Sequence, residues 1–183
     1  MITEPRALGA HLLFFRNGKP FTVPSAGTCS KTAKPGAADL GWVNLGTLED
    51  VQVEKKATTI EIFGPTPGQL RRTKVIETKK TLDITFTCQD TSDLAVEAMF
   101  GTQALEPADQ QWNPLAGAEI EGWLKGQIYD HRDQLWVVID MWVNLRAEGA
   151  VAINSADGQL NKVRLIAYGL HSPLNTGTKP ASA

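Results

Sequence analysis

The residues best equipped for chemistry form one short run, Asp130-His131-Arg132-Asp133, which places acids, a base and a cation side by side. Such a set could transfer protons or hold a metal ion. Because the run lies between two apolar segments, it is better explained as the turn of a hairpin. Glu119 and Glu121 are two residues apart, so on a strand both carboxylates would share a face, where a pair can do general acid–base work. The solubility of an exposed strand explains this pair equally well.

Other catalytic and metal-binding patterns are missing from the sequence. It holds no Gly-x-Ser-x-Gly elbow, no phosphate-binding loop and no dinucleotide fingerprint. His171 and Ser172 adjoin the polar C-terminal stretch, where a nucleophile would lack a rigidly held base. Cys29, Cys88 and the three histidines show no zinc-type spacing, so we interpret the cysteines as free thiols of a reducing compartment. The sequence therefore predicts no enzymatic activity, no cofactor and no metal.

Aromatic and basic residues also suggest binding functions. On an exposed sheet face tryptophans would suit a carbohydrate, but burial in a core or subunit interface is the commoner use. The five tryptophans are Trp42, Trp112, Trp123, Trp136 and Trp142. The basic pairs Arg71-Arg72 and Lys79-Lys80 are too short for a nucleic-acid-binding patch, and no aromatic residues interleave with them.

Composition is that of an ordinary soluble domain. The chain has 183 residues, 42% hydrophobic and 21% charged, which favours one domain over residues 1–183 with a sizeable core. No apolar stretch approaches the ~18 residues of a membrane span, and the N-terminus lacks a signal-peptide pattern. Charge is unevenly spread: residues 90–158 carry twelve acidic and three basic side chains, whereas 1–47 and 159–183 are net basic. This distribution is explained either by chance clustering on a solvated surface or by attraction between copies of the chain, basic ends against acidic middles, with one surface left negative.

Glycine, proline, alanine and threonine dominate the first 47 residues. Asn17-Gly18 between the apolar run Leu12–Phe15 and Phe21 with Val23 predicts a type I′ hairpin. We interpret residues 24–40 as an irregular connection, so that about 1–41 would form an arm or hairpin region outside the core. The polar end of the chain, about 172–183, is predicted to be a mobile tail.

A strand is predicted from Leu48 onward. Val51 and Val53 have one parity and Ile60 and Ile62 the other, so a bulge is expected between Lys55 and Thr59. The stretch that follows contains two prolines and two glycines, which argues against a central strand and predicts a long loop with a basic tip. Its residues are Gly64, Pro65, Pro67, Gly68, Arg71 and Arg72.

Strict alternation over residues 81–89 is the clearest signal in the chain. Leu82, Ile84, Phe86 and Cys88 would face a core, and the intervening polar residues, with Asp83 among them, would face water. Residues 91–93 offer helix caps, Leu94 to Phe100 follow as a helix of about two turns, and Gly101 would end it.

Three more strands follow the helix. Residues 102–118 and 154–158 are predicted to be loop and turn, and strands are predicted at 119–129, 134–145 and 160–169. The strand at 134–145 is largely apolar on both sides, which requires cover on both faces. The helix or another subunit could cover its face with Trp136, Val138 and Trp142. Together these elements predict a mainly β fold, an antiparallel sandwich or partly open barrel with one short flanking helix.

The order of these elements resembles a known family. The runs GWVNLGTLEDVQVEKKATTIEIFGP and TKKTLDITFTCQDTSDLAVEAMFGT, joined by the basic Pro/Gly-rich stretch, resemble the major tail (tail tube) proteins of long-tailed bacteriophages, and the later strands continue the likeness over roughly residues 42–170. The resemblance implies a structural virion protein, made in the host cytoplasm, whose hexameric rings stack into a tube for genome delivery. It implies as partners further copies of the chain and the tape-measure, initiator and terminator proteins of the tail. DNA would pass through without specific binding.

A tube of this kind assigns roles to three sets of residues. Cationic walls bind DNA by counterion release, so the bore should be polar or acidic. The expected lumen-facing residues are Thr81, Asp83, Thr85, Thr87, Gln89, Glu119 and Glu121. The loop Gly64–Arg72 is expected to contact the next ring, and Trp136, Val138 and Trp142 to lie in an interface or under a cover. The alternatives are a carbohydrate- or receptor-binding β-sandwich module and, with a convergent Asp/His/Ser pocket, a small hydrolase.

Overall fold

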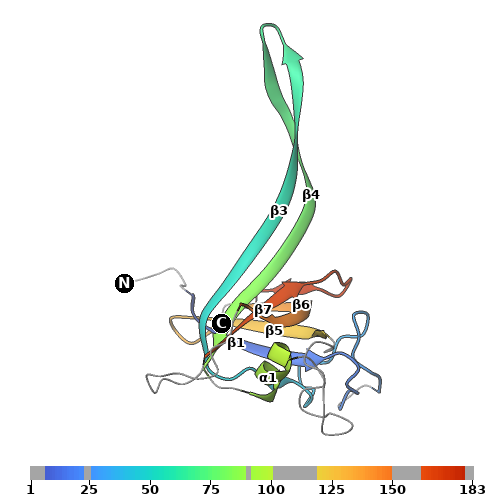
Figure 1. Ribbon diagram of the computed structural model, residues 1–183, viewed down its shortest axis with the longest axis vertical. Helices are drawn as coiled ribbons and strands as arrows, with labels where there is room; N and C mark the ends of the chain where they lie inside the picture. The colour runs from blue at the N-terminus through green and yellow to red at the C-terminus, as the bar shows by residue number, and fades with distance from the viewer. Residues whose placement is uncertain (1–6, 23–25, 90–91, 101–118, 150–161, 180–183) are drawn as a thin grey trace.

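One antiparallel sheet organises the protein (Figure 1). The computed structural model describes residues 7–22, 26–89, 92–100, 119–149 and 162–179. Within these ranges the elements are β1 (Ala7–Arg16), β2 (Val43–Asn44), β3 (Leu48–Thr66), β4 (Gln69–Cys88), α1 (Asp93–Phe100), β5 (Ile120–Asp130), β6 (Leu135–Ala147), β7 (Val163–Gly169) and β8 (Thr176–Thr178). The strand order is β2-β1-β5-β6-β7-β4-β3, with β8 added to β6, and the sheet is not closed into a barrel. The predicted class, mainly β and antiparallel with one short helix, is confirmed.

The main core lies between one face of this sheet and α1. The apolar residues of the alternating stretch, Ile84, Phe86 and Cys88, are buried there with Val143 and Leu165 from β6 and β7. α1 packs on the sheet through Leu94 and Ala95. Its cap is as predicted, because the Ser92 hydroxyl accepts a hydrogen bond from the Ala95 amide at 3.3 Å. Gly101 and the loops predicted at 102–118 and 154–158 lie outside the described residues.

The largest departure from prediction is a long hairpin in place of a long loop. β3 continues to Thr66 and β4 begins at Gln69, so only Pro67 and Gly68 make the turn, with Gly68 at φ 84°. The hairpin projects far from the body (Figure 1). Proline is tolerated in β3 because this strand lies at the sheet edge, where an N–H can be missing without breaking a ladder on both sides.

The expected irregularity between Lys55 and Thr59 is present, with a different cause. Thr58 pairs with Lys79 and Thr59 with Glu77, so the extra residue is Thr78 of β4 rather than a residue of β3. The prediction assumed that the apolar residues of β3 all lie on one buried face. In the projecting part, both faces of the hairpin are exposed, so no such face exists there.

The N-terminal hairpin and arm predictions are wrong. Asn17 and Gly18 do form a turn, but β1 pairs with β5 along its length and with β2, not with the chain that follows the turn. That chain instead lies over the second face of the sheet. We call its described residues, 19–22 and 26–42, the cover segment. Its Cys29 is buried in a second cluster with Phe15, Trp123 and Trp142, so this segment belongs to a core.

The C-terminal stretch is also more ordered than predicted. Residues 176–178 form β8 on β6, and the Ser172 hydroxyl donates a hydrogen bond to the Lys31 carbonyl at 2.6 Å. The mobile-tail prediction is therefore wrong for 172–179, while 180–183 lie outside the described residues. Within the described ranges, no helix is both long and apolar enough to cross a membrane.

Candidate functional surfaces

Cross-strand register gathers the predicted lumen-facing residues on one side of the sheet. Glu121 pairs with Asn144, Asn144 with Tyr168, Tyr168 with Asp83, and Asp83 with Glu54. Directly paired residues share a sheet face, so Asp83 and Glu121 lie in one lateral row despite their separation in sequence. This side of the sheet is opposite the α1 core. We call the part of it that lies outside the cover segment the polar face. The next rows bring Thr85, Thr87, Ile166, Arg164 and Arg146 onto it.

Ion pairs neutralise the basic residues of the polar face. Arg146 contacts Glu119, Arg164 lies 2.6 Å from Glu148, and Lys162 lies 2.6 Å from Glu49. Hydrogen bonds from Lys162 and Gln89 lower the pKa of Glu49. Exposed pairs of this kind add little stability, at most about 1 kcal/mol each. Their consequence is electrostatic, because each arginine of this face is offset by a glutamate.

The sequence predicted that Asp83 faces water, but the structure buries it. The residue is only 6% exposed, and its carboxylate lies 3.3 Å from the Lys56 ammonium, which also contacts Glu54 at 3.1 Å. Glu54 and Asp83 together raise the pKa of Lys56. The prediction failed because alternation within β4 could not reveal a lysine placed beside Asp83 by the neighbouring strand. Thr81, Thr85, Thr87, Gln89 and Glu121 are half-buried and Glu119 is exposed.

Trp142 is covered by its own chain rather than by α1 or a second subunit. It is buried and stacks edge-to-face on Trp123, with ring centres 5.7 Å apart, beneath the cover segment. The Asn175 side chain accepts a hydrogen bond from the Trp142 amide at 2.9 Å. Val138, paired with Thr178 of β8, and Trp136 are half-buried. α1 packs on the opposite face of β6.

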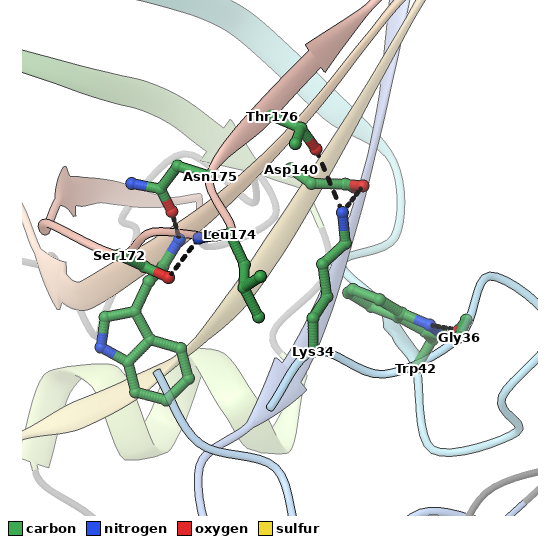
Figure 2. Close-up of polar contacts among 9 residues, drawn as sticks. Lys34, Gly36, Trp42, Asp140, Ser172, Leu174, Asn175 and Thr176 are labelled. Carbon is green, nitrogen blue, oxygen red and sulfur yellow. Dashed lines mark hydrogen bonds and ion pairs between the residues drawn. The ribbon is translucent and has the colours of Figure 1, made fainter. Parts of the chain in front are cut away.

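A partly buried charge cluster, which the sequence did not predict, fastens the cover segment to the sheet (Figure 2). The Lys34 ammonium lies 2.5 Å from Asp140 and 3.1 Å from the Thr176 hydroxyl, so it joins three separate parts of the chain. Lys125, the register partner of Asp140, lies 4.7 Å from the centre of the Trp42 ring. The available signal was Asp140 itself, one acid in a run of apolar residues.

The charged form of Lys125 is disfavoured by its burial. Burial lowers its pKa, an effect opposed by Asp140 and reinforced by Lys34. Asp140 must therefore balance two ammonium groups, and its Oδ1 has no hydrogen-bond partner among the described residues. Asp140→Ala would leave two ammonium groups without their counter-charge, and removing one partner of a buried pair costs about 3–5 kcal/mol. Lys125→Met would instead remove the buried ammonium and leave Asp140 paired with Lys34.

We therefore expect Asp140→Ala to destabilise the protein by about 3 kcal/mol, with Lys125→Met as the matched, nearly neutral variant. Because the folded pKa of Lys125 lies below its unfolded value, the unfolded state binds more protons at this group, and its contribution to stability rises with pH up to about 10.5. Lys125→Met should flatten that rise. Urea unfolding of both variants at several pH values measures this, and equal losses from the two substitutions would contradict it.

The charged run at 130–133 forms the turn between β5 and β6. The Asp130 carboxylate accepts hydrogen bonds from the amides of Arg132 at 2.8 Å and Gln134 at 3.0 Å. Burial would raise the pKa of Asp130, but these bonds and the Arg132 guanidinium lower it overall. Across the described residues, no three His, Cys, Asp or Glu side chains are arranged to hold a metal ion.

The projecting hairpin, residues 57–80, is the most unusual surface. Its described side chains are exposed, and apolar residues occur on both faces: Ile60, Ile62 and Ile76 on one, Phe63, Leu70 and Val75 on the other. It carries five basic and two acidic residues. A two-stranded ribbon alone is marginally stable in water, and large exposed apolar patches mark interaction sites.

Comparison with protein-family models and with curated proteins finds no match to this chain. The geometry therefore carries the functional argument: a neutralised polar face on one side of a sheet, and a basic, apolar hairpin that extends beyond the body. Both suit contacts with other macromolecules.

Proposed function

We propose that this chain is a structural subunit that polymerises into a tube of stacked rings, the phage tail tube, through which DNA leaves the virion. The projecting hairpin is the observation that carries the proposal. Its two apolar faces need partners that the described part of its own body does not supply, and its length lets it reach a copy in the next ring. Tape-measure, initiator and terminator proteins would be the other partners in the tail.

Charge supports a second copy as the partner of the hairpin. Residues 57–80 have a net charge of +3, from five basic and two acidic residues, whereas the rest of the chain has thirteen basic and eighteen acidic residues. Opposite charges favour a contact in which the hairpin of one copy meets the body of another. Such a head-to-tail contact uses two different surfaces, so it leaves both ends open and propagates.

The sheet supports the ring. Among the described strands, β3 pairs on one side only, with β4, and open edges of this kind need a partner or protection. Joining sheets around a ring removes such edges and encloses a channel when many strands take part. The polar face would line that channel, because its arginines are offset by glutamates and would hold DNA weakly.

The described tryptophans do not favour a carbohydrate-binding module. Trp123 and Trp142 are buried, and Trp42 and Trp136 are half-buried, so none of these four offers a fully open ring for a sugar. The fifth, Trp112, lies outside the described residues.

Electron microscopy of the purified protein at increasing concentration tests the proposal. We expect rings and hollow tubes, with assembly favoured at low salt because the contacts are electrostatic in part. A monomer or trimer that stays unassembled at every concentration and salt, and binds oligosaccharide, would contradict it and support a carbohydrate-binding module instead.

A further inference from the structure

An apolar groove lies at the base of the hairpin. It has a volume of about 340 Å³ and runs between β1 and β3, which face one another across the open side of the sheet. Ala10 and Leu12 contribute from β1, Val51 and Val53 from β3, and Ile139 from β6. Val53, at 46% exposed, forms its lip. The groove is thus an open extension of the main core.

Backbone features keep the groove open. Gly9, Ala10 and Gly126 line it with little or no side chain, and a Cβ on Gly126 would make an ordinary contact with Leu12 at 3.4 Å and take up groove volume. β3 leaves its register with β4 between Glu49 and Gln52, and Asp50 there has a φ of 50°. This irregularity places Asp50 at the groove, where it is the one acidic side chain among the described lining residues.

We propose that this groove receives the hairpin tip of a second copy of the chain. The apolar residues near that tip, Phe63 and Leu70, match the apolar lining, and the positive charges of Arg71 and Arg72 complement the negative charge of Asp50. The chain's own tip cannot be the occupant, because Val53 and Phe63 are ten residues apart on one strand, about 33 Å when extended. The inference rests on the proposed tube, and it names the contact that stacks its rings.

In this arrangement the length of the hairpin sets the spacing between successive rings. Each copy has its groove beside the base of the hairpin and its apolar side chains near the tip. Successive rings would therefore be separated by about the distance between the two, roughly 30–45 Å from the strand rise over ten to fourteen residues.

Disulfide trapping tests the contact. In Val53→Cys/Phe63→Cys, the two new thiols cannot meet within one copy, so oxidation should yield a ladder of reducible covalent oligomers. The native thiols will not compete, because Cys29 and Cys88 are buried and burial, aided by the charge of Asp39, raises the pKa of Cys29 to about 12. The matched control is Leu40→Cys/Phe63→Cys, since Leu40 is exposed but lies away from the groove.

We expect the ladder from the Val53 pair only. Tubes seen by microscopy without that ladder, or an equal ladder from the Leu40 pair, would overturn the groove assignment and leave the tube intact. A ladder without tubes would support the groove contact and count against the tube. Absence of both tubes and ladder would overturn both.

Discussion

Removing the projecting hairpin should abolish tube growth and leave a folded body. Lys56 and Thr81 are direct register partners, so an Asn-Gly turn can join them and replace residues 57–80. The deleted side chains are exposed and contribute nothing to either core, and the Lys56–Asp83 pair is retained. Circular dichroism and thermal unfolding should be close to those of the intact protein, while microscopy should show no tubes.

Reversing the positive charge at the hairpin tip should also impair tube assembly. Arg71→Glu with Arg72→Glu should raise the protein concentration needed for assembly at least about tenfold, equivalent to 1.4 kcal/mol per contact, and Arg71→Lys with Arg72→Lys is the matched control. The Arg72–Glu61 pair at 2.6 Å is exposed, so its loss should not unfold the hairpin. Normal tubes from the truncated protein would show that the hairpin does not stack rings.

Reversing charge on the polar face should spare assembly and impair DNA passage. Glu121→Lys changes the charge by two units per copy on a half-buried position of that face. A tube repeats this change around and along its bore, and DNA presents one phosphate charge per ~1.7 Å, so the wall would become adhesive. Particles should form in normal numbers and eject DNA at least about tenfold more slowly, an effect that high salt should relieve.

The matched control places the same added charge elsewhere. Thr32→Lys with Gln134→Lys adds two positive charges at exposed positions, in the cover segment and in the β5–β6 turn. These particles should eject at the normal rate. Equal rates from the control and Glu121→Lys would show that the polar face does not line the bore. Asp83 is a poor site for this test, because its burial against Lys56 would add a folding defect.

The elements that were predicted correctly are those defined by residues close together in the sequence. Alternation over residues 81–89 identified the inner part of β4, and Ser92 marked the start of α1, because one buried face and one cap suffice to define each. The prolines and glycines of 64–68 misled the prediction, since their cost depends on whether a strand lies at the centre or the edge of a sheet. The edge position of β3 is a property of the whole topology.

Long-range partners were the second source of error. Segment 24–40 has the composition of a loop, yet Cys29 and Lys34 anchor it on the sheet through residues more than ninety positions away. Nothing near Lys34 indicates Asp140, and nothing near Asp83 indicates Lys56. The polar face was predicted in part, because parity placed Glu121 and the β4 threonines on defined sides of their strands. Their union in one face required the register of β5, β6, β7 and β4.

The most direct test of the tube is a cryo-electron microscopy reconstruction of polymers grown from the intact, purified protein. We predict a hollow tube with an axial repeat of roughly 30–45 Å, Glu121 and the Thr85–Thr87 stretch on the inner wall, and each hairpin directed at the neighbouring ring. Polymers whose bore is lined by the cover segment, or whose hairpins extend into solvent without touching another copy, would contradict the account.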